Sequence, residues 1–175
     1  MDFRRVLGSL VEGFRAKDID YALIGGFALA LWGVSRATVD LDFLVPRDRL
    51  PGVDEVMTHL GYELRYRTEN VSQFVSPDRQ LGAVDFLHAF RSASAHMLAA
   101  AVERAAFDGA LRVRVLRPED LVGLKVQALK KDPRREVTDA AQAADEAVEF
   151  LVQYNAFVSH EPKPFRPIAD HDMRL

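Results

Sequence analysis

The stretch that decides the fold is Tyr21-Ala22-Leu23-Ile24-Gly25-Gly26, followed after a spacer by Arg36-Ala37-Thr38-Val39-Asp40-Leu41-Asp42-Phe43. The apolar run that ends at Ile24 predicts a short buried strand. The two glycines after it let the backbone approach a neighbour or ligand closely and start a helix without a side-chain clash. The residues from 40 to 45 predict a second strand, so the two runs together favour an α/β arrangement.

Asp40 and Asp42 are predicted to share one face of the second strand, because successive side chains of a strand alternate between faces. Two neighbouring carboxylates repel each other, and a divalent cation is their usual partner. An Asp-x-Asp by itself is more often a solvated strand face, and a Gly-Gly pair is more often a plain turn. It is their combination in the order strand, Gly-Gly, short helix, strand that favours a metal site.

The rest of the chain predicts further helices and strands around this stretch. Apolar residues at helical spacing predict a first helix over 3–14, with Asp2 as its N-cap. Other helices are predicted at 27–32, 50–60, 92–106, 118–131 and 134–154, other strands at 62–66, 71–75, 82–87 and 111–116, and an extended tail at 157–175. The expected fold class is α/β, a small mixed β-sheet flanked by helices with a C-terminal helical cap. The expected divisions are a core over 1–117, packed C-terminal helices over 118–156 and the tail.

Composition limits the classes of function. With 175 residues, of which 49% are hydrophobic, the chain is long enough for one domain with a real core. A net charge of −3 argues against a protein that coats nucleic acid by bulk charge. The absence of cysteine excludes disulfides, zinc–thiolate sites and thiol catalysis. No apolar run is long enough to span a membrane, so a cytoplasmic location is expected.

Asp85 is the third carboxylate of interest, within Val84-Asp85-Phe86-Leu87. Aspartate is depleted in strands, and a lone buried carboxylate is costly, so Asp85 should face a ligand, a metal or water. The alternative is an exposed aspartate on an edge strand. The five histidines show no metal-ligand spacing and are expected to be structural or surface residues. Among them only His88, three residues after Asp85, is close enough in sequence to need checking.

Five other residues are candidates for contacts with phosphate. Lys125 stands in a largely apolar helix, where a lysine either extends its amine to solvent or meets an anion. Arg36, just before the Asp-x-Asp, would neutralise phosphate or form a structural ion pair. Thr38 is expected to order its turn by hydrogen bonding. Arg112 and Arg114 share one strand face, which is either part of a phosphate groove or, as we favour, a solvated face.

Residues 24–45 resemble the signature of the DNA polymerase beta-like nucleotidyltransferase superfamily. The Arg36-x-Thr38-x-Asp40-x-Asp42 spacing is similar to the version typical of the nucleotidyltransferase-like toxins of abortive-infection, or type IV toxin–antitoxin, systems. The resemblance implies the nucleotidyltransferase fold and Mg²⁺-dependent transfer of a nucleoside monophosphate from an NTP to a hydroxyl. It also implies a tRNA or protein acceptor and a cognate antitoxin as partner.

The resemblance further implies a role for each site residue. Asp40, Asp42 and Asp85 would hold two Mg²⁺ ions, with Mn²⁺ as the alternative metal, and Asp85 would also take the proton of the attacking hydroxyl. The NTP would be bound by four residues of the first motif, Gly25, Gly26, Arg36 and Thr38. The segment around Lys125 resembles the family's second motif, whose lysine contacts the nucleotide and supports catalysis. Asp139 resembles the acidic residue that follows, but Gln142 stands where many relatives carry another aspartate, so a surface charge is the alternative.

Two other functions stay open at this point. An aminoglycoside-type nucleotidyltransferase shares Gly-Gly and Asp-x-Asp, and it would need an acidic pocket for a cationic drug. A non-catalytic NTP-binding component of a toxin–antitoxin pair is the alternative outside the enzymes. The intact set of three aspartates argues against that alternative, because a dead site is free to lose them.

Overall fold

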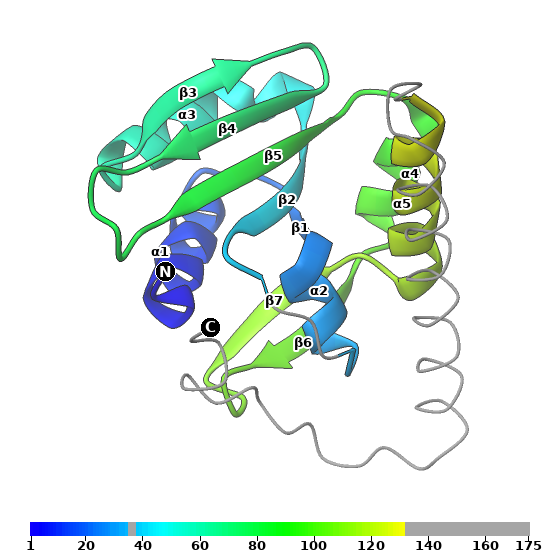
Figure 1. The fold of residues 1–175 in the computed structure, drawn as a ribbon, viewed down its shortest axis with the longest axis horizontal. Coiled ribbons are helices and arrows are strands. Elements are labelled where there is room, and N and C mark those ends of the chain that lie inside the picture. Colours follow the sequence, from blue (N-terminus) through cyan, green and yellow to red (C-terminus); the bar gives the residue numbers. More distant parts are fainter. Residues whose placement is uncertain (35–37, 132–175) are drawn as a thin grey trace.

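A computed structural model describes residues 1–34 and 38–131 (Figure 1). Its strands are β1 (Ala22–Ile24), β2 (Leu41–Pro46), β3 (Glu63–Arg67), β4 (Val71–Val75), β5 (Ala83–Ala89), β6 (Val102–Ala106) and β7 (Leu111–Val115). Its helices are α1 (Phe3–Ala16), α2 (Gly25–Leu31), α3 (Leu50–His59), α4 (Ser92–Ala99) and α5 (Pro118–Lys131), with a 3-10 turn η1 (Arg47–Arg49). The predicted helix at 134–154 and the tail at 157–175 lie outside the described residues.

Within the described ranges the strands form one mixed sheet in the order β3-β4-β5-β2-β1-β7-β6. The pairs β1–β7 and β2–β5 are parallel, and the other neighbouring pairs are antiparallel. The α/β class with a mixed sheet flanked by helices is therefore confirmed. None of the helices in the described part of the chain is long and apolar enough to cross a membrane.

Helix α1 forms as its sequence predicts. The Asp2 side chain caps it by accepting a hydrogen bond from the Arg5 backbone N–H at 3.1 Å. Its apolar stripe is buried, and the Phe14 ring meets the Phe43 and Phe86 rings edge-on at centroid distances of 5.6 and 6.1 Å. Helix α1 also contacts α3. The stripe of α1 thus covers one face of the sheet at β2 and β5.

The register of β2 and β5 places apolar and acidic residues on opposite faces. Phe43 lies opposite Phe86, and Asp42 lies opposite Asp85. Residues that face each other across neighbouring strands point to the same side of the sheet, and the next pair points to the other side. Because α1 covers the face with Phe43 and Phe86, the two aspartates lie on the opposite face.

The predicted helix over 92–106 is wrong in its second half. Helix α4 ends at Ala99, and the residues of β6 pair with β7, with Val102 opposite Val115 and Ala106 opposite Leu111. The alanine-rich composition favours a helix, but pairing with a buried neighbouring strand overrides this intrinsic preference. A turn with Asp108 and Gly109 at positive φ joins the two strands.

Candidate active site

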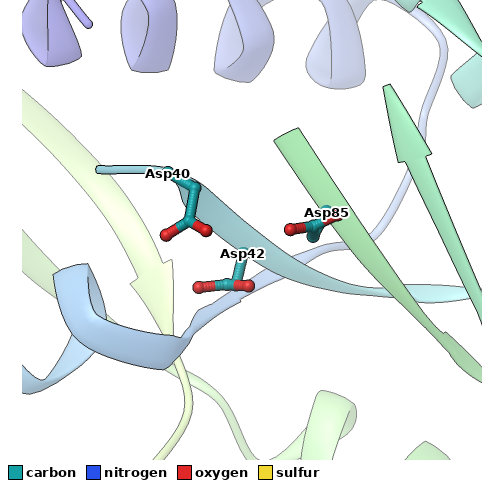
Figure 2. Close-up of side chains that lie close together, drawn as sticks. All are labelled: Asp40, Asp42 and Asp85. Atoms are coloured by element: carbon teal, nitrogen blue, oxygen red, sulfur yellow. The ribbon is translucent and has the colours of Figure 1, made fainter. Parts of the chain in front are cut away.

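Three carboxylates meet beside the start of β2 (Figure 2). Asp42 on β2 lies directly opposite Asp85 on β5, and Asp40 lies just before β2, which begins one residue later than predicted. One carboxylate oxygen from each residue lies within 4.8 Å of the other two. The sheet therefore brings together the three aspartates that the sequence singles out, although 43 positions separate Asp42 from Asp85 along the chain.

The glycine pair allows the backbone between β1 and α2 to pass close to this cluster. Gly25 has φ +67°, and a Cβ added there would overlap the Asp42 carboxylate. A Cβ on Gly26 would lie 2.8 Å from the Cβ of Thr38. Both positions are thus closed to side chains, because the residues around the Asp-x-Asp already fill the space.

Thr38 orders the segment that leads into β2, as predicted. Its hydroxyl lies 3.1 Å from Asp40 Oδ1 and 3.2 Å from the Asp40 carbonyl oxygen, and it donates to them. The hydroxyl therefore fixes both the backbone and the carboxylate of Asp40. Arg36 lies outside the described residues.

Asp85 combines a buried carboxylate oxygen with a raised pKa. Its Oδ1 atom is buried and has no hydrogen-bond partner among the described residues. Burial raises the pKa of Asp85 above its ordinary value of 3.8, and the neighbouring Asp40 charge raises it further. A hydrogen bond from the Gln73 side chain and the charge of Arg65 act in the opposite direction. The buried Asp85 oxygen without a hydrogen-bond partner and the two neighbouring carboxylates together form a set of hard oxygen donors that suits Mg²⁺ or Mn²⁺.

The other predicted residues are not among those that meet at the three aspartates. Lys125 is half-buried on α5. Two residues earlier on the same helix, Gly123 lies near Met97 of α4, because a Cβ added at Gly123 would be 3.8 Å from the Met97 methyl carbon. An approach of Lys125 to the aspartates stays a prediction. Arg112 is exposed, and Arg114 forms an ion pair with Asp20 at 2.7 Å. Asp139 and Gln142 lie outside the described residues.

His88 is a structural residue, as predicted. Its Nδ1 lies 3.0 Å from the Glu69 carbonyl oxygen, and its Nε2 lies 3.0 Å from the Ser72 hydroxyl. Because a carbonyl only accepts, Nδ1 must carry the proton, and the hydroxyl donates to Nε2. Burial lowers the pKa of His88, which keeps the ring neutral. It points to the face that α1 covers, away from the aspartates, since Phe86 two positions earlier does so.

Sequence reasoning missed Gln73 and Arg65, the two polar residues that act on Asp85. Gln73 on β4 lies directly opposite Asp85. A glutamine between Val71 and Val75, on the same face of the predicted strand as these two residues, was the available signal. Its partner could not be read from the sequence, because the register between β4 and β5 depends on pairing in three dimensions.

Comparison with known families gives a match over residues 8–142 to the family described as nucleotidyl transferase AbiEii toxin, type IV TA system. No curated protein gives a significant match. The solution structure of the antibiotic-resistance factor ANT(2'')-Ia is similar with a TM-score of 0.60 and 17% identity, over 91% of this chain and 98% of that one. Its crystal structure with adenylyl-2''-tobramycin gives a TM-score of 0.59 and 17% identity, over 89% and 96%.

A third similar structure is the lincosamide antibiotic adenylyltransferase LnuA with lincomycin bound. Its TM-score is 0.52 with 14% identity, over 67% of this chain and 82% of that one. At these identities the likeness shows the fold alone. The nucleotidyltransferase fold predicted from the first motif is thus confirmed.

The close approach at Gly25 predicts a difference between two glycines that both have positive φ. Gly61 also has positive φ, at +82°, but a Cβ there would meet nothing within 4 Å. Gly61→Ala should therefore cost about 1 kcal/mol of unfolding free energy, the strain of a left-handed residue. Gly25→Ala should cost about 3 kcal/mol, because it adds overlap with Asp42 to the same strain. Urea denaturation measures both, and equal losses would contradict the close approach.

The raised pKa of Asp85 predicts how stability depends on pH in the metal-free protein. The folded state binds the Asp85 proton more tightly than the unfolded state, so the carboxylate lowers stability progressively as pH rises above 3.8 through the folded-state pKa. Asp85→Asn should therefore raise the melting temperature at pH 7 and leave it unchanged at pH 3. Thermal melts across this range test the trend, with Asp48→Asn on the exposed η1 turn as the matched control. A higher melting temperature for the wild type at pH 7 would refute it.

Proposed function

We propose a function from the premise that the chain belongs to the family of nucleotidyl transferase AbiEii toxins of type IV toxin–antitoxin systems. The proposed reaction moves a nucleoside monophosphate from an NTP to a hydroxyl of an acceptor and depends on Mg²⁺. The observation that carries this proposal is the convergence of Asp40, Asp42 and Asp85 within 4.8 Å beside the glycine pair.

The three aspartates would hold the metal. Their carboxylates supply hard oxygen ligands, and the unpartnered Oδ1 of Asp85 gives one ligand atom that nothing else in the described residues uses. When bound, divalent ions polarise the α-phosphate and stabilise the charge on the departing pyrophosphate. Mn²⁺ suits the same donor set as Mg²⁺.

Asp85 is the residue we assign to the proton of the acceptor. The acceptor oxygen forms a bond to the α-phosphorus, the bond from that phosphorus to the bridging oxygen breaks, and pyrophosphate leaves. The hydroxyl proton passes to Asp85. In the metal-free protein, burial raises the pKa of this carboxyl, so Asp85 binds a proton more readily than an exposed aspartate does.

The triphosphate needs cationic and amide contacts in addition to the metal. We assign backbone N–H groups at Gly25 and Gly26, the side chain of Thr38, and the cations Arg36 and Lys125 to this role. A triphosphate carries about four negative charges, and the leaving pyrophosphate needs support on the side away from the metal. A lysine on a separate helix supplies that support as a mobile point charge.

The acceptor we favour is a hydroxyl of tRNA or of a protein, with a cognate antitoxin as the partner that restrains the activity. The family description, a toxin of a type IV system, supports this choice. A small-molecule acceptor is the second candidate. It is favoured by one observation, that the structures of ANT(2'')-Ia with adenylyl-2''-tobramycin and of LnuA with lincomycin share this fold.

A labelling experiment tests the reaction. The purified protein is incubated with each α-labelled NTP and Mg²⁺, together with bulk tRNA, cell lysate cleared of small molecules, or an aminoglycoside. We expect label on a macromolecule with one NTP, and loss of the label in EDTA. Asp40→Asn should reduce labelling by about 10³-fold, because a ligand of the metal contributes several kcal/mol to the transition state.

Asp48→Asn is the control for that substitution, since it removes an exposed aspartate of η1 at the other end of β2. It should label as the wild type does. Label on the aminoglycoside alone would replace the favoured acceptor by the second candidate. No label on any acceptor with any NTP, from protein that is folded by circular dichroism, would refute the proposed reaction.

Lys125 is tested by a separate substitution. Lys125→Ala should lower NTP affinity by about tenfold and turnover by about 10²-fold, because it removes one charge-assisted contact to the leaving group. Its melting temperature should stay near that of the wild type. Lys17→Ala removes an exposed lysine that pairs with Glu55 of α3, and it serves as the matched control. Full activity of Lys125→Ala would remove Lys125 from the site.

A further inference from the structure

A row of polar side chains crosses four neighbouring strands and includes two aspartates of the site. Arg65 on β3 donates from Nη1 to Gln73 Oε1 on β4 at 3.3 Å. Gln73 lies directly opposite Asp85 of β5 in the sheet, and its side chain, as a hydrogen-bond donor, lowers the pKa of Asp85. Asp42 on β2 continues the same row on the other side of Asp85. All four residues therefore belong to one face of the sheet.

A β-bulge in β3 sorts its two arginines between the two faces. Leu64 lies opposite Phe74, but Tyr66 rather than Arg65 lies opposite Gln73, so Arg65 is the extra residue. In a regular strand Arg65 and Arg67 would point to the same side. Here Arg67 instead lies opposite Ser72 and pairs with Asp54 of α3, while Arg65 reaches Gln73.

The neighbours of the Gln73 amide fix its orientation. A guanidinium only donates hydrogen bonds, so Arg65 requires the amide oxygen on its side. An ionised carboxylate only accepts, so Asp85 requires the amide nitrogen. Because Oδ1 of Asp85 has no partner among the described residues, Oδ2 is the oxygen that the amide nitrogen can engage.

We propose that Gln73, held in turn by Arg65, is a positioning residue that fixes the Asp85 carboxylate by one oxygen and leaves Oδ1 for the cation and the acceptor hydroxyl. This inference rests on the proposed function. The terminal torsion of an aspartate has a broad preference, so the carboxylate needs a second group to set its plane. Groups that orient metal ligands in this way contribute about 10- to 100-fold to metal affinity or activity.

The experiment compares four variants with the wild type. Mn²⁺ affinity of the metal-free protein is measured by electron paramagnetic resonance, and nucleotidyl transfer is measured with the labelled NTP. Gln73→Met keeps the length of the side chain and removes the amide, and it should weaken Mn²⁺ binding and lower turnover by about 10- to 100-fold. Arg65→Met should lower both by about three- to tenfold, because the Gln73 amide then loses the donor that holds its orientation.

The double variant shows whether Arg65 acts through Gln73 or whether the two residues act on the site independently. If Arg65 works through Gln73, adding Arg65→Met to Gln73→Met should cause no further loss. Arg67→Met is the matched control, because it removes the same type of side chain from the same strand but from the other face. It should lower the melting temperature through its lost contact with Asp54, and leave Mn²⁺ affinity and turnover as in the wild type.

Three results would overturn the inference: wild-type Mn²⁺ affinity and turnover in Gln73→Met, a multiplicative further loss in the double variant, or an equal loss in Arg67→Met. If Gln73→Met does not fold, the exposed Arg65→Met decides alone, with Arg65→Lys expected to restore most of the loss. Failure of the proposed function looks different, because the wild type itself would then neither bind Mn²⁺ nor transfer label.

Discussion

The parallel pairing of β2 with β5 is the constraint on which the rest of this structure depends. It sets Asp42 opposite Asp85, and on the other face it stacks the Phe43 and Phe86 rings at 5.7 Å. A slip of one residue would turn Asp85 into the core and Phe86 to the site, because side chains alternate along a strand. The burial of the aromatic face therefore holds the acidic face in register, and core packing and site geometry are two results of one alignment.

The site is also where the fold works against its own stability. Three carboxylates lie together, one of them with a buried oxygen that has no partner in the described residues. The repulsion is offset by apolar burial elsewhere, notably by the Phe14 ring against two strands at once. Neighbouring polar side chains also interact with two of the carboxylates. Thr38 fixes the Asp40 carboxylate by a hydrogen bond, and the Gln73 side chain lowers the pKa of Asp85.

The parts that the sequence predicts well are those that depend on neighbours along the chain. Gly25, Gly26, Asp40 and Asp42 lie within one β-α-β segment, and alternation along a strand is enough to place the last two together. Asp85 was found by a different signal, an aspartate among apolar residues. The features that could not be predicted from the sequence depend on pairing between strands that are distant along the chain. The composition of Val102–Ala106 favours a helix, and only pairing with β7 makes this segment a strand. The contact of Arg65 with Gln73 depends on a β-bulge that no local sequence pattern specifies.

The strand order has a consequence for how the protein is made. Leu23 of the inner strand β1 pairs with Val115 of β7, and Asp42 of β2 lies opposite Asp85 of β5. Neither pair can form while only the first half of the described chain has been synthesised. Contacts so distant in sequence form slowly, and until β7 arrives one edge of β1 stays open. A nascent chain that stops before Asp85 carries two of the three acids and no assembled site. The acidic cluster is thus assembled only after most of the sheet has been translated.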